Sequence, residues 1–184
     1  MRGYFGIGIV KCKTSENYGT LFRTANIFNA SFLFMVASRF KKQCSDTMRS
    51  ERHIPLTEYN TLKDLKDKLP YGCKLVGIEL DDKAIEIQNY NHPIRACYVL
   101  GAEDYGLSKE EMSLCHEIIK IPGDHSLNVA VAGSIVIYDR ILKARKTCTI
   151  LKKEQPSYLQ LIDKDSEKIR GLFADIENKM NLIS

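Results

Sequence analysis

Short apolar runs of strand length alternate with segments of helical periodicity through the first 145 residues of the chain. The predicted strands are residues 4–10, 31–37, 74–80, 96–100 and 117–121, and the predicted helices are residues 17–30, 61–69, 109–115 and 126–143. The run at 31–37, Ser-Phe-Leu-Phe-Met-Val-Ala, is continuously apolar, which is typical of a parallel strand buried on both faces. The alternation predicts an α/β domain built around a mostly parallel sheet.

Polar residues stand at the expected starts of three of these helices. Asn17 and Ser126 belong to the residue types that most often cap helices, and Ser108 with Glu111 three residues later has the pattern of a capping box. Residues 61–69 predict a short amphipathic helix, ended by the proline and glycine that follow it.

The C-terminal region departs from the alternation. After Pro156, apolar residues recur at helical spacing through residues 169–180, which predicts one amphipathic helix. We therefore expect a main domain at residues 1–148 and a C-terminal helical extension at residues 149–184.

Composition indicates a globular protein from a reducing compartment. Of the residues, 44% are apolar and 27% are charged, as in ordinary globular domains. Six cysteines lie 18 to 33 residues apart without any Cys-x-x-Cys pair, which argues against a zinc site and against a small disulfide scaffold. Free thiols favour the cytoplasm, and no apolar run is long enough to span a membrane.

The net charge of +4 is modest, but the basic residues are grouped. One group is Arg39, Lys41, Lys42, Arg49, Arg52 and His53, and the other is Lys143, Arg145, Lys146, Lys152 and Lys153. Such groups either contact the phosphates of a nucleic acid or simply solvate the surface, and the sequence leaves both readings open.

Three short motifs carry the candidate chemistry, and the first is Asn17-Tyr-Gly-Thr-Leu-Phe-Arg-Thr-Ala. Leu21, Ala25 and Phe28 recur at i, i+4 and i+7 and predict the core face of its helix. Arg23 lies about 200° around the helix from Leu21 and therefore points away from the core. An exposed guanidinium near a helix start suits recognition of phosphate or ribose, although an ordinary surface arginine has the same pattern.

The second motif, Leu-Gly-Ala-Glu-Asp-Tyr-Gly-Leu-Ser at residues 100–108, directly follows a predicted strand. Gly101 and Gly106 permit tight turns and a close approach of the backbone to a ligand. Ligands of open α/β sheets bind beyond the carboxyl ends of the strands, where this loop must lie. We expect Glu103 to hold a polar group of a substrate or to pair with Arg23, and the alternative is a solvated acid in a glycine turn.

The third motif, Ile-Pro-Gly-Asp-His-Ser-Leu-Asn-Val at residues 121–129, joins a predicted strand to the long apolar helix. Ser126 is the expected helix cap, and Asn128 in the first turn offers both donors and acceptors. His125 has a reference pKa of about 6.5 that would suit a general base, but a surface histidine in a loop is the simpler interpretation.

The order and separation of the three motifs resemble those of SPOUT-class RNA methyltransferases of the SpoU/TrmH type, over roughly the first 145 residues. The resemblance implies methyl transfer from S-adenosylmethionine to a ribose 2′-hydroxyl of tRNA or rRNA, without a metal. It also implies a deep trefoil knot at the C-terminal side of the sheet, and a homodimer with the site near the subunit interface.

The resemblance also assigns roles to residues. The implied catalytic residues are Arg23, Asn17, Glu103 and Asn128, and the implied cofactor-binding residues are Ile78, Gly101, Ile121, Ser126 and Leu127. Because the reference pKa of arginine is about 12.5–13.8, we expect Arg23 to orient the ribose and stabilise the developing alkoxide, and not to remove the proton.

Three other functions compete with this one. A non-enzymatic RNA-binding protein of the same fold would not be expected to keep Arg23, Glu103 and Asn128. A methyltransferase acting on a base is disfavoured by the arginine in the first motif. An α/β domain that binds a small nucleotide at its strand ends would differ in not needing RNA.

Overall fold

The computed structural model describes residues 3–39, 41 and 44–154, and the fold below is that of the compact unit Met1–Ala144. Its elements are β1 (Tyr4–Val10), α1 (Ser15–Ile27), β2 (Phe32–Val36), the 3-10 turn η1 (Ser50–Arg52), β3 (Leu56–Tyr59), α2 (Leu62–Asp67), β4 (Lys74–Ile78), β5 (Ile85–Glu86), the 3-10 turn η2 (Ile87–Asn89), β6 (Arg95–Leu100), α3 (Lys109–Leu114), β7 (Glu117–Lys120) and α4 (Val129–Glu154).

The strands form one sheet in the spatial order β3-β2-β1-β6-β4-β7-β5, and each neighbouring pair is parallel. The predicted parallel α/β sheet is thus confirmed, and the strand predicted at residues 4–10 coincides with β1. Because all strands run the same way, the loops after β1, β4, β6 and β7 leave the sheet at one edge. The three motifs therefore lie at this edge of the sheet.

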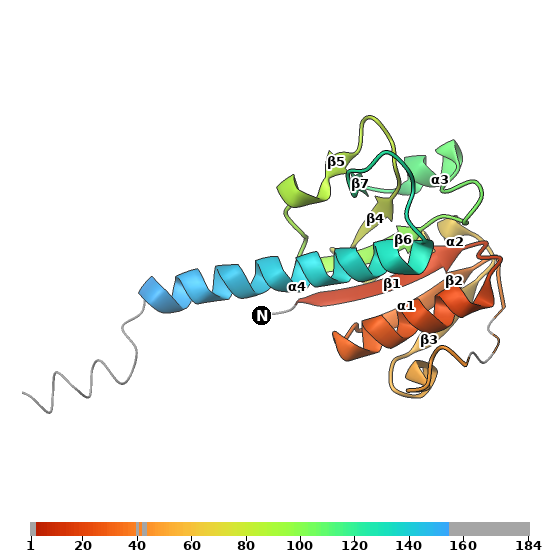
Figure 1. The fold of residues 1–184 in the computed structure, drawn as a ribbon, viewed down its shortest axis with the longest axis horizontal. Helices are drawn as coiled ribbons and strands as arrows, with labels where there is room; N and C mark the ends of the chain where they lie inside the picture. Colours follow the sequence, from red (N-terminus) through yellow and green to blue (C-terminus); the bar gives the residue numbers. More distant parts are fainter. Residues whose placement is uncertain (1–2, 40, 42–43, 155–184) are drawn as a thin grey trace, which may run out of the picture. The chain divides into compact units, whose positions relative to one another are not determined.

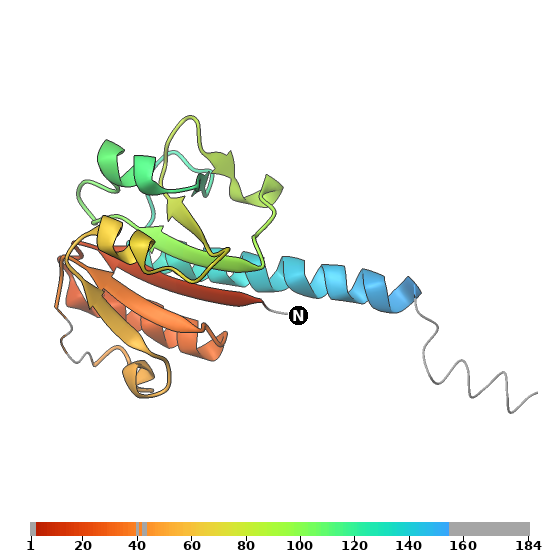
Figure 2. The ribbon, with the colours of Figure 1, turned by 180° about the vertical axis from the view of Figure 1, so that it is seen from behind.

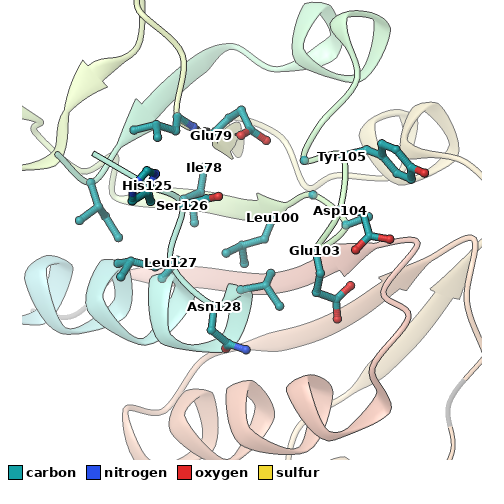
Figure 3. Close-up of a pocket in the computed structure, with 17 residues that line it drawn as sticks. Ile78, Glu79, Leu100, Glu103, Asp104, Tyr105, His125, Ser126, Leu127 and Asn128 are labelled. Carbon is teal, nitrogen blue, oxygen red and sulfur yellow. Dashed lines mark hydrogen bonds between the residues drawn. The ribbon is translucent and has the colours of Figure 1, made fainter. Parts of the chain in front are cut away.

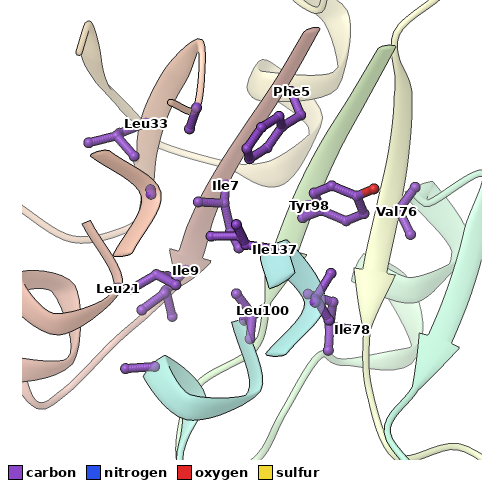
Figure 4. Packing of buried hydrophobic residues seen from close by; sticks show 14 of the residues in the cluster. Phe5, Ile7, Ile9, Leu21, Leu33, Val76, Ile78, Tyr98, Leu100 and Ile137 are labelled. Carbon is purple, nitrogen blue, oxygen red and sulfur yellow. The ribbon is translucent and has the colours of Figure 1, made fainter. Parts of the chain in front are cut away.

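Helices cover both faces of the sheet (Figures 1 and 2). On one face, α1 and the first turns of α4 contribute residues such as Leu21 and Ile137, which pack with strand residues such as Ile7 and Tyr98 (Figure 4). On the other face, α2 and α3 cover a second cluster that includes Cys97 and residues of β2 and β4. Burial on both faces explains why the strand predictions based on continuous apolar runs succeeded.

The predicted capping box is present in the structure, whereas the two predicted single caps are not. Ser108 accepts a hydrogen bond from the backbone of Glu111 and receives one back, so the box at the start of α3 is confirmed. Asn17 does not cap α1, because the helix begins two residues earlier at Ser15. Ser126 does not cap α4 either, because that helix begins at Val129.

Asn128 is the residue that caps α4. Its Oδ1 accepts hydrogen bonds from the backbone N–H of Ala130 at 2.9 Å and of Val131 at 3.3 Å. The residues before it, from the end of β7 onward, are therefore released from the helix and form a loop.

A buried polar cluster fastens α4 to β6. Arg140, 3% exposed, donates hydrogen bonds to the backbone oxygens of Pro93 and Ile94 and, at 3.0 Å, to the hydroxyl of Tyr98. The His92 ring lies between that hydroxyl, at 2.6 Å, and Asp139 of α4, at 2.8 Å. These bonds fix the rotation of α4 against the sheet, and so fix where its first turn lies.

Sequence reasoning missed β3 and β5. The first has only half-buried and exposed residues, and the second has two residues, so neither gives an apolar run. No helix in the described part of the chain combines the length and the apolar character needed to cross a membrane. The helix predicted within residues 169–180 lies outside the described residues.

Candidate active site

A cavity of about 450 Å³ opens at the carboxyl edge of the sheet, beyond β4, β6 and β7 (Figure 3). Its walls are residues 78–80, residues 100–106, Ile121, residues 125–129 and Ala132. The five residues expected to bind a cofactor, Ile78, Gly101, Ile121, Ser126 and Leu127, all line this cavity. So do Glu103 and Asn128, whereas Asn17 and Arg23 do not.

Two glycines shape the loop after β6. Residues 102–106 close into a small hairpin in which Ala102 and Gly106 exchange backbone hydrogen bonds of 3.2 and 2.9 Å. A Cβ at Gly101 would lie 2.0 Å from the carbonyl carbon of Gly106, so the backbone itself excludes any side chain there. Gly106 has a φ of +61°, and a Cβ there would lie 2.2 Å from the carboxylate of Glu79.

The Glu103 carboxylate turns toward the loop between β1 and α1. It accepts hydrogen bonds from the backbone N–H of Lys13 at 3.1 Å and of Thr14 at 3.2 Å, and from the Asn17 amide at 2.8 Å. The thiol of Cys12 donates a further bond to it at 3.2 Å. The expected pairing with Arg23 is therefore wrong, because amides and a thiol surround this carboxylate.

These donors decide the charge of Glu103. Partial burial acts to raise its pKa, but the hydrogen bonds from the backbone of Lys13 and of Glu103 itself, from Asn17 and from Cys12 outweigh burial and lower the pKa to about 2. Burial, together with the neighbouring carboxylate, raises the pKa of Cys12, so that its thiol remains a protonated donor. Glu103 is thus a fixed anion, and it makes a poor proton acceptor.

Asn17 and Asn128 extend this network to the start of α4. The Asn128 amide donates to Oδ1 of Asn17 at 3.0 Å, and Asn17 in turn donates to Glu103. The partners set the orientation of each amide, because this series of hydrogen bonds ends at a carboxylate on one side and at a helix cap on the other. The network holds the three motifs together at the mouth of the cavity, and Figure 3 shows Glu103 and Asn128 on its two sides.

Arg23 lies apart from this network. Its side chain is exposed on α1, as predicted, and it makes no hydrogen bond or ion pair with any residue that the structure describes. It stands six positions after Asn17, which corresponds to about 9 Å along the helix. The structure therefore brings Asn17, Glu103 and Asn128 together, and leaves Arg23 facing outward.

The cavity is also lined by residues that were not among the predicted site residues, and three of these have polar side chains at its edge. Glu79 accepts hydrogen bonds from the backbone of Leu107 at 2.6 Å and of Leu80 at 3.0 Å, and so ties the end of β4 to the loop after β6. Tyr105 and His125 complete the rim. Glu79 was hidden within an apolar predicted strand, and the other two stood in loops without periodicity.

A parallel α/β sheet with a cavity among the loops at its carboxyl edge defines a ligand-binding protein of the open-sheet class. The sequence matches the SpoU rRNA Methylase family over residues 5–138, and the chain belongs to that family.

Among relatives, the chain is 27% identical over 175 residues to a tRNA (guanosine(18)-2'-O)-methyltransferase of Borreliella burgdorferi, covering 91% of this chain and 79% of that protein. It is 39% identical over 75 residues to the 23S rRNA (guanosine-2'-O-)-methyltransferase RlmB of Acinetobacter baylyi, covering 39% of this chain and 30% of that one. The Escherichia coli tRNA (guanosine(18)-2'-O)-methyltransferase is 25% identical over 130 residues, which span 57% of its length.

Solved structures share the fold. The SpoU methyltransferase AviRb from Streptomyces viridochromogenes superposes with a TM-score of 0.70 at 20% identity, over 78% of this chain and 61% of that one. The TrmH/SpoU tRNA modifying enzyme of A. aeolicus superposes with a TM-score of 0.69 at 20% identity, over 89% of this chain and 86% of that one.

Proposed function

We propose that this protein transfers a methyl group from S-adenosylmethionine to the ribose 2′-hydroxyl of a structured RNA, either a tRNA or an rRNA. The observation that carries the proposal is one cavity lined by all five residues expected to bind the cofactor, and closed by the Asn128–Asn17–Glu103 network. The named activities of relatives, methylation of guanosine 2′-oxygens in tRNA and 23S rRNA, support the same chemistry.

The residues of the cavity fit the cofactor. A volume of about 450 Å³ lies in the usual range for small-ligand sites. Ile78, Leu100 and Leu127 offer apolar surface for a purine, and the loops at Gly101 and Ser126 offer backbone groups. When bound, S-adenosylmethionine supplies an electrophilic methyl carbon on its sulfonium sulfur. The walls would hold it by packing and backbone hydrogen bonds, without any metal.

The four predicted catalytic residues act by their position and their charge. Glu103 and Asn17 fix the loop after β1 against the loop after β6, and Asn128 fixes the start of α4. Arg23 orients the ribose and its phosphate and stabilises the developing alkoxide. Its outward position suits contact with a large substrate.

We further propose a homodimer. An apolar stripe remains exposed on α4, formed by Val131, Ile135, Tyr138 and Leu142 at the helical spacing of one face. The Tyr138 ring meets Phe28 at the end of α1 with a centroid distance of 6.2 Å, so the stripe continues onto the helix that carries Arg23. A second copy that covers this stripe would bury it.

The expected trefoil knot also belongs to this proposal. The chain leaves β7 on the far side of β4 and β6, and its next helix starts beside α1, as the bond between Asn128 and Asn17 requires. The segment between β7 and α4 therefore crosses the carboxyl edge of the sheet, which is the path such a knot needs. We also propose that the activity is cytoplasmic, where tRNA and rRNA are found.

The test is a labelling assay with purified protein, labelled S-adenosylmethionine and unmodified total tRNA and rRNA. Labelled nucleosides are identified by mass spectrometry after digestion. We expect label in 2′-O-methylnucleosides, a loss of at least 100-fold in Arg23→Ala, and no comparable loss in Arg95→Ala. Arg95 is the matched control because it is an exposed arginine at the amino end of β6, opposite the cavity.

Other outcomes point to the competing functions. Label on a base would contradict ribose methylation and favour a base-directed methyltransferase. RNA binding without label in either pool, and without cofactor binding by calorimetry, would favour a non-catalytic RNA-binding protein.

A further inference from the structure

A large aromatic side chain stands exposed at the rim of the cavity and takes no part in the network that closes it. Tyr105 is 82% exposed and lines the cavity from the tip of the hairpin at residues 102–106. In Figure 3 it projects from the side of this hairpin that faces away from Leu127. Tyr105 belongs to neither buried cluster of the described residues, so core packing does not account for a tyrosine there.

The hairpin that carries Tyr105 is held from three directions. At its base Ala102 and Gly106 exchange two backbone hydrogen bonds. On one side, the Glu103 carboxylate binds the loop after β1, and on the other Glu79 accepts from the backbone of Leu107. A ring on so constrained a loop is already positioned for a ligand, which lowers the entropic cost of binding.

A lysine lies beside the Tyr105 ring. The ammonium of Lys13 lies 5.4 Å from the centroid of the Tyr105 ring and forms an ion pair with Asp104. The side chain of Lys13 is still 59% exposed, so its ammonium can also meet a phosphate. An exposed aromatic ring with a cation beside it is the usual arrangement for stacking an unpaired base while binding its backbone.

We propose that Tyr105 stacks on a nucleobase of the RNA, at or next to the nucleotide that is methylated, while Lys13 contacts the adjoining phosphate. This inference rests on the proposed function and names how the same site selects its substrate. A stacked base must be free of its own neighbours, so the protein selects a target nucleotide in a loop or bulge. Every base has a ring face, so stacking alone gives no strong preference for one base.

The first experiment uses the absence of tryptophan from the sequence. Tyr105→Trp introduces the sole tryptophan at the hairpin, and Tyr71→Trp, at a position 96% exposed before the amino end of β4, is the matched control. Each variant is titrated with unmodified tRNA and rRNA, while the anisotropy of the labelled RNA reports binding. We expect the emission of Tyr105→Trp to be quenched by half or more, and that of Tyr71→Trp to change by less than a tenth.

The second experiment is kinetic. Tyr105→Ala is expected to raise the KM for RNA by about 5- to 150-fold, the range expected for one lost stacked base, with the Kd for S-adenosylmethionine unchanged. Tyr105→Phe should restore the KM to within about threefold of wild type, because stacking needs the ring and not the hydroxyl. Tyr71→Ala should leave the KM as it is.

The outcomes separate this inference from the proposed function. RNA that is bound and methylated while the emission of Tyr105→Trp stays constant would overturn the stacking inference alone. The same holds if Tyr105→Ala keeps the wild-type KM, or if Tyr105→Phe is as impaired as Tyr105→Ala. Binding with quenching but without methylation would support stacking and contradict the enzyme. Absence of binding to either RNA pool would overturn both.

Discussion

The charge of Glu103 links the stability of the site to pH. Its pKa is lowered to about 2 in the folded protein, against an ordinary value of 4.5. A lowered pKa means that the carboxylate stabilises the fold fully above about pH 4.5, and that this contribution is lost as the pH falls from there toward 2. The loops after β1 and β6 should therefore separate in acid before the buried core unfolds.

We expect Glu103→Gln to lower the free energy of unfolding at pH 7 by about 1–2 kcal/mol, because the amide keeps the shape but loses the charged acceptor. Thermal unfolding followed by circular dichroism from pH 7 to pH 2 should show the gap from wild type narrowing below pH 4.5. Glu110→Gln, at an exposed position of α3, is the control and should match wild type throughout. A gap that stays constant with pH would contradict the assignment of the charge.

At the level of single residues, three of the four predicted catalytic residues meet, but the sequence did not predict how they interact. Glu103, Asn17 and Asn128 were expected at one site, and they form one chain of hydrogen bonds. Their partners could not be predicted, because Lys13 and Thr14 contribute backbone N–H groups, which any residue type can supply. Asn17 illustrates the limit, since its residue type suggests a helix cap and its tertiary contacts place it inside the helix.

The hairpin of residues 102–106 depends on the absence of a side chain at Gly101. A methyl group there would lie 2.0 Å from the carbonyl carbon of Gly106 and 2.3 Å from the nitrogen of Leu107, and both are backbone atoms that cannot rotate away. A methyl group at this position would force the hairpin open, and residues 102–106 of the hairpin form one wall of the cavity.

We expect Gly101→Ala to raise the Kd for S-adenosylmethionine at least tenfold by calorimetry and to destabilise the fold by about 1–3 kcal/mol. Gly123→Ala is the matched control, because it stands in the loop after β7 and its added methyl would come no closer than 3.6 Å to the backbone of His125. It should bind the cofactor as wild type does. Wild-type affinity in Gly101→Ala would show that this wall does not contact the cofactor.

The elements themselves were predicted to the extent that they are buried. Strands such as β2 and β6 have both faces covered, so they appear as apolar runs, whereas edge strand β3 is half exposed and leaves no such signal. The start of α4 was placed too early because Ser126 and Asn128 are both good cap residues. In the structure Asn128 caps α4, and its side chain also donates a hydrogen bond to Asn17 on α1.

For the whole molecule, the exposed stripe on α4 leads to a prediction about assembly. Four apolar side chains at 37% to 56% exposure lie on one face of the helix. A face of this kind is costly to leave in water. A second copy of the chain is the occupant we propose, because a symmetric pair of helices buries the same face twice.

Ile135→Glu places a charge in the middle of the stripe, and burying an unpaired charge is strongly unfavourable. Analytical ultracentrifugation should show wild type near twice the chain mass of 21.0 kDa and the variant near that mass itself. Tyr71→Glu, equally charged but at a position 96% exposed on another part of the surface, should remain dimeric. A wild-type protein that sediments as a monomer at micromolar concentration would rule out this interface.

The same dimer makes a prediction about Arg23, which does not line the cavity of its own chain. If each cavity uses the arginine of the partner copy, co-expressed Arg23→Ala and Asn128→Ala chains form heterodimers with one complete site. Half of a random mixture is heterodimeric, so about a quarter of wild-type activity should return although each variant alone is inactive. Activity that stays absent in the mixture, with heterodimers verified by mass, would place Arg23 at the cavity of its own chain, where binding of RNA must draw it in.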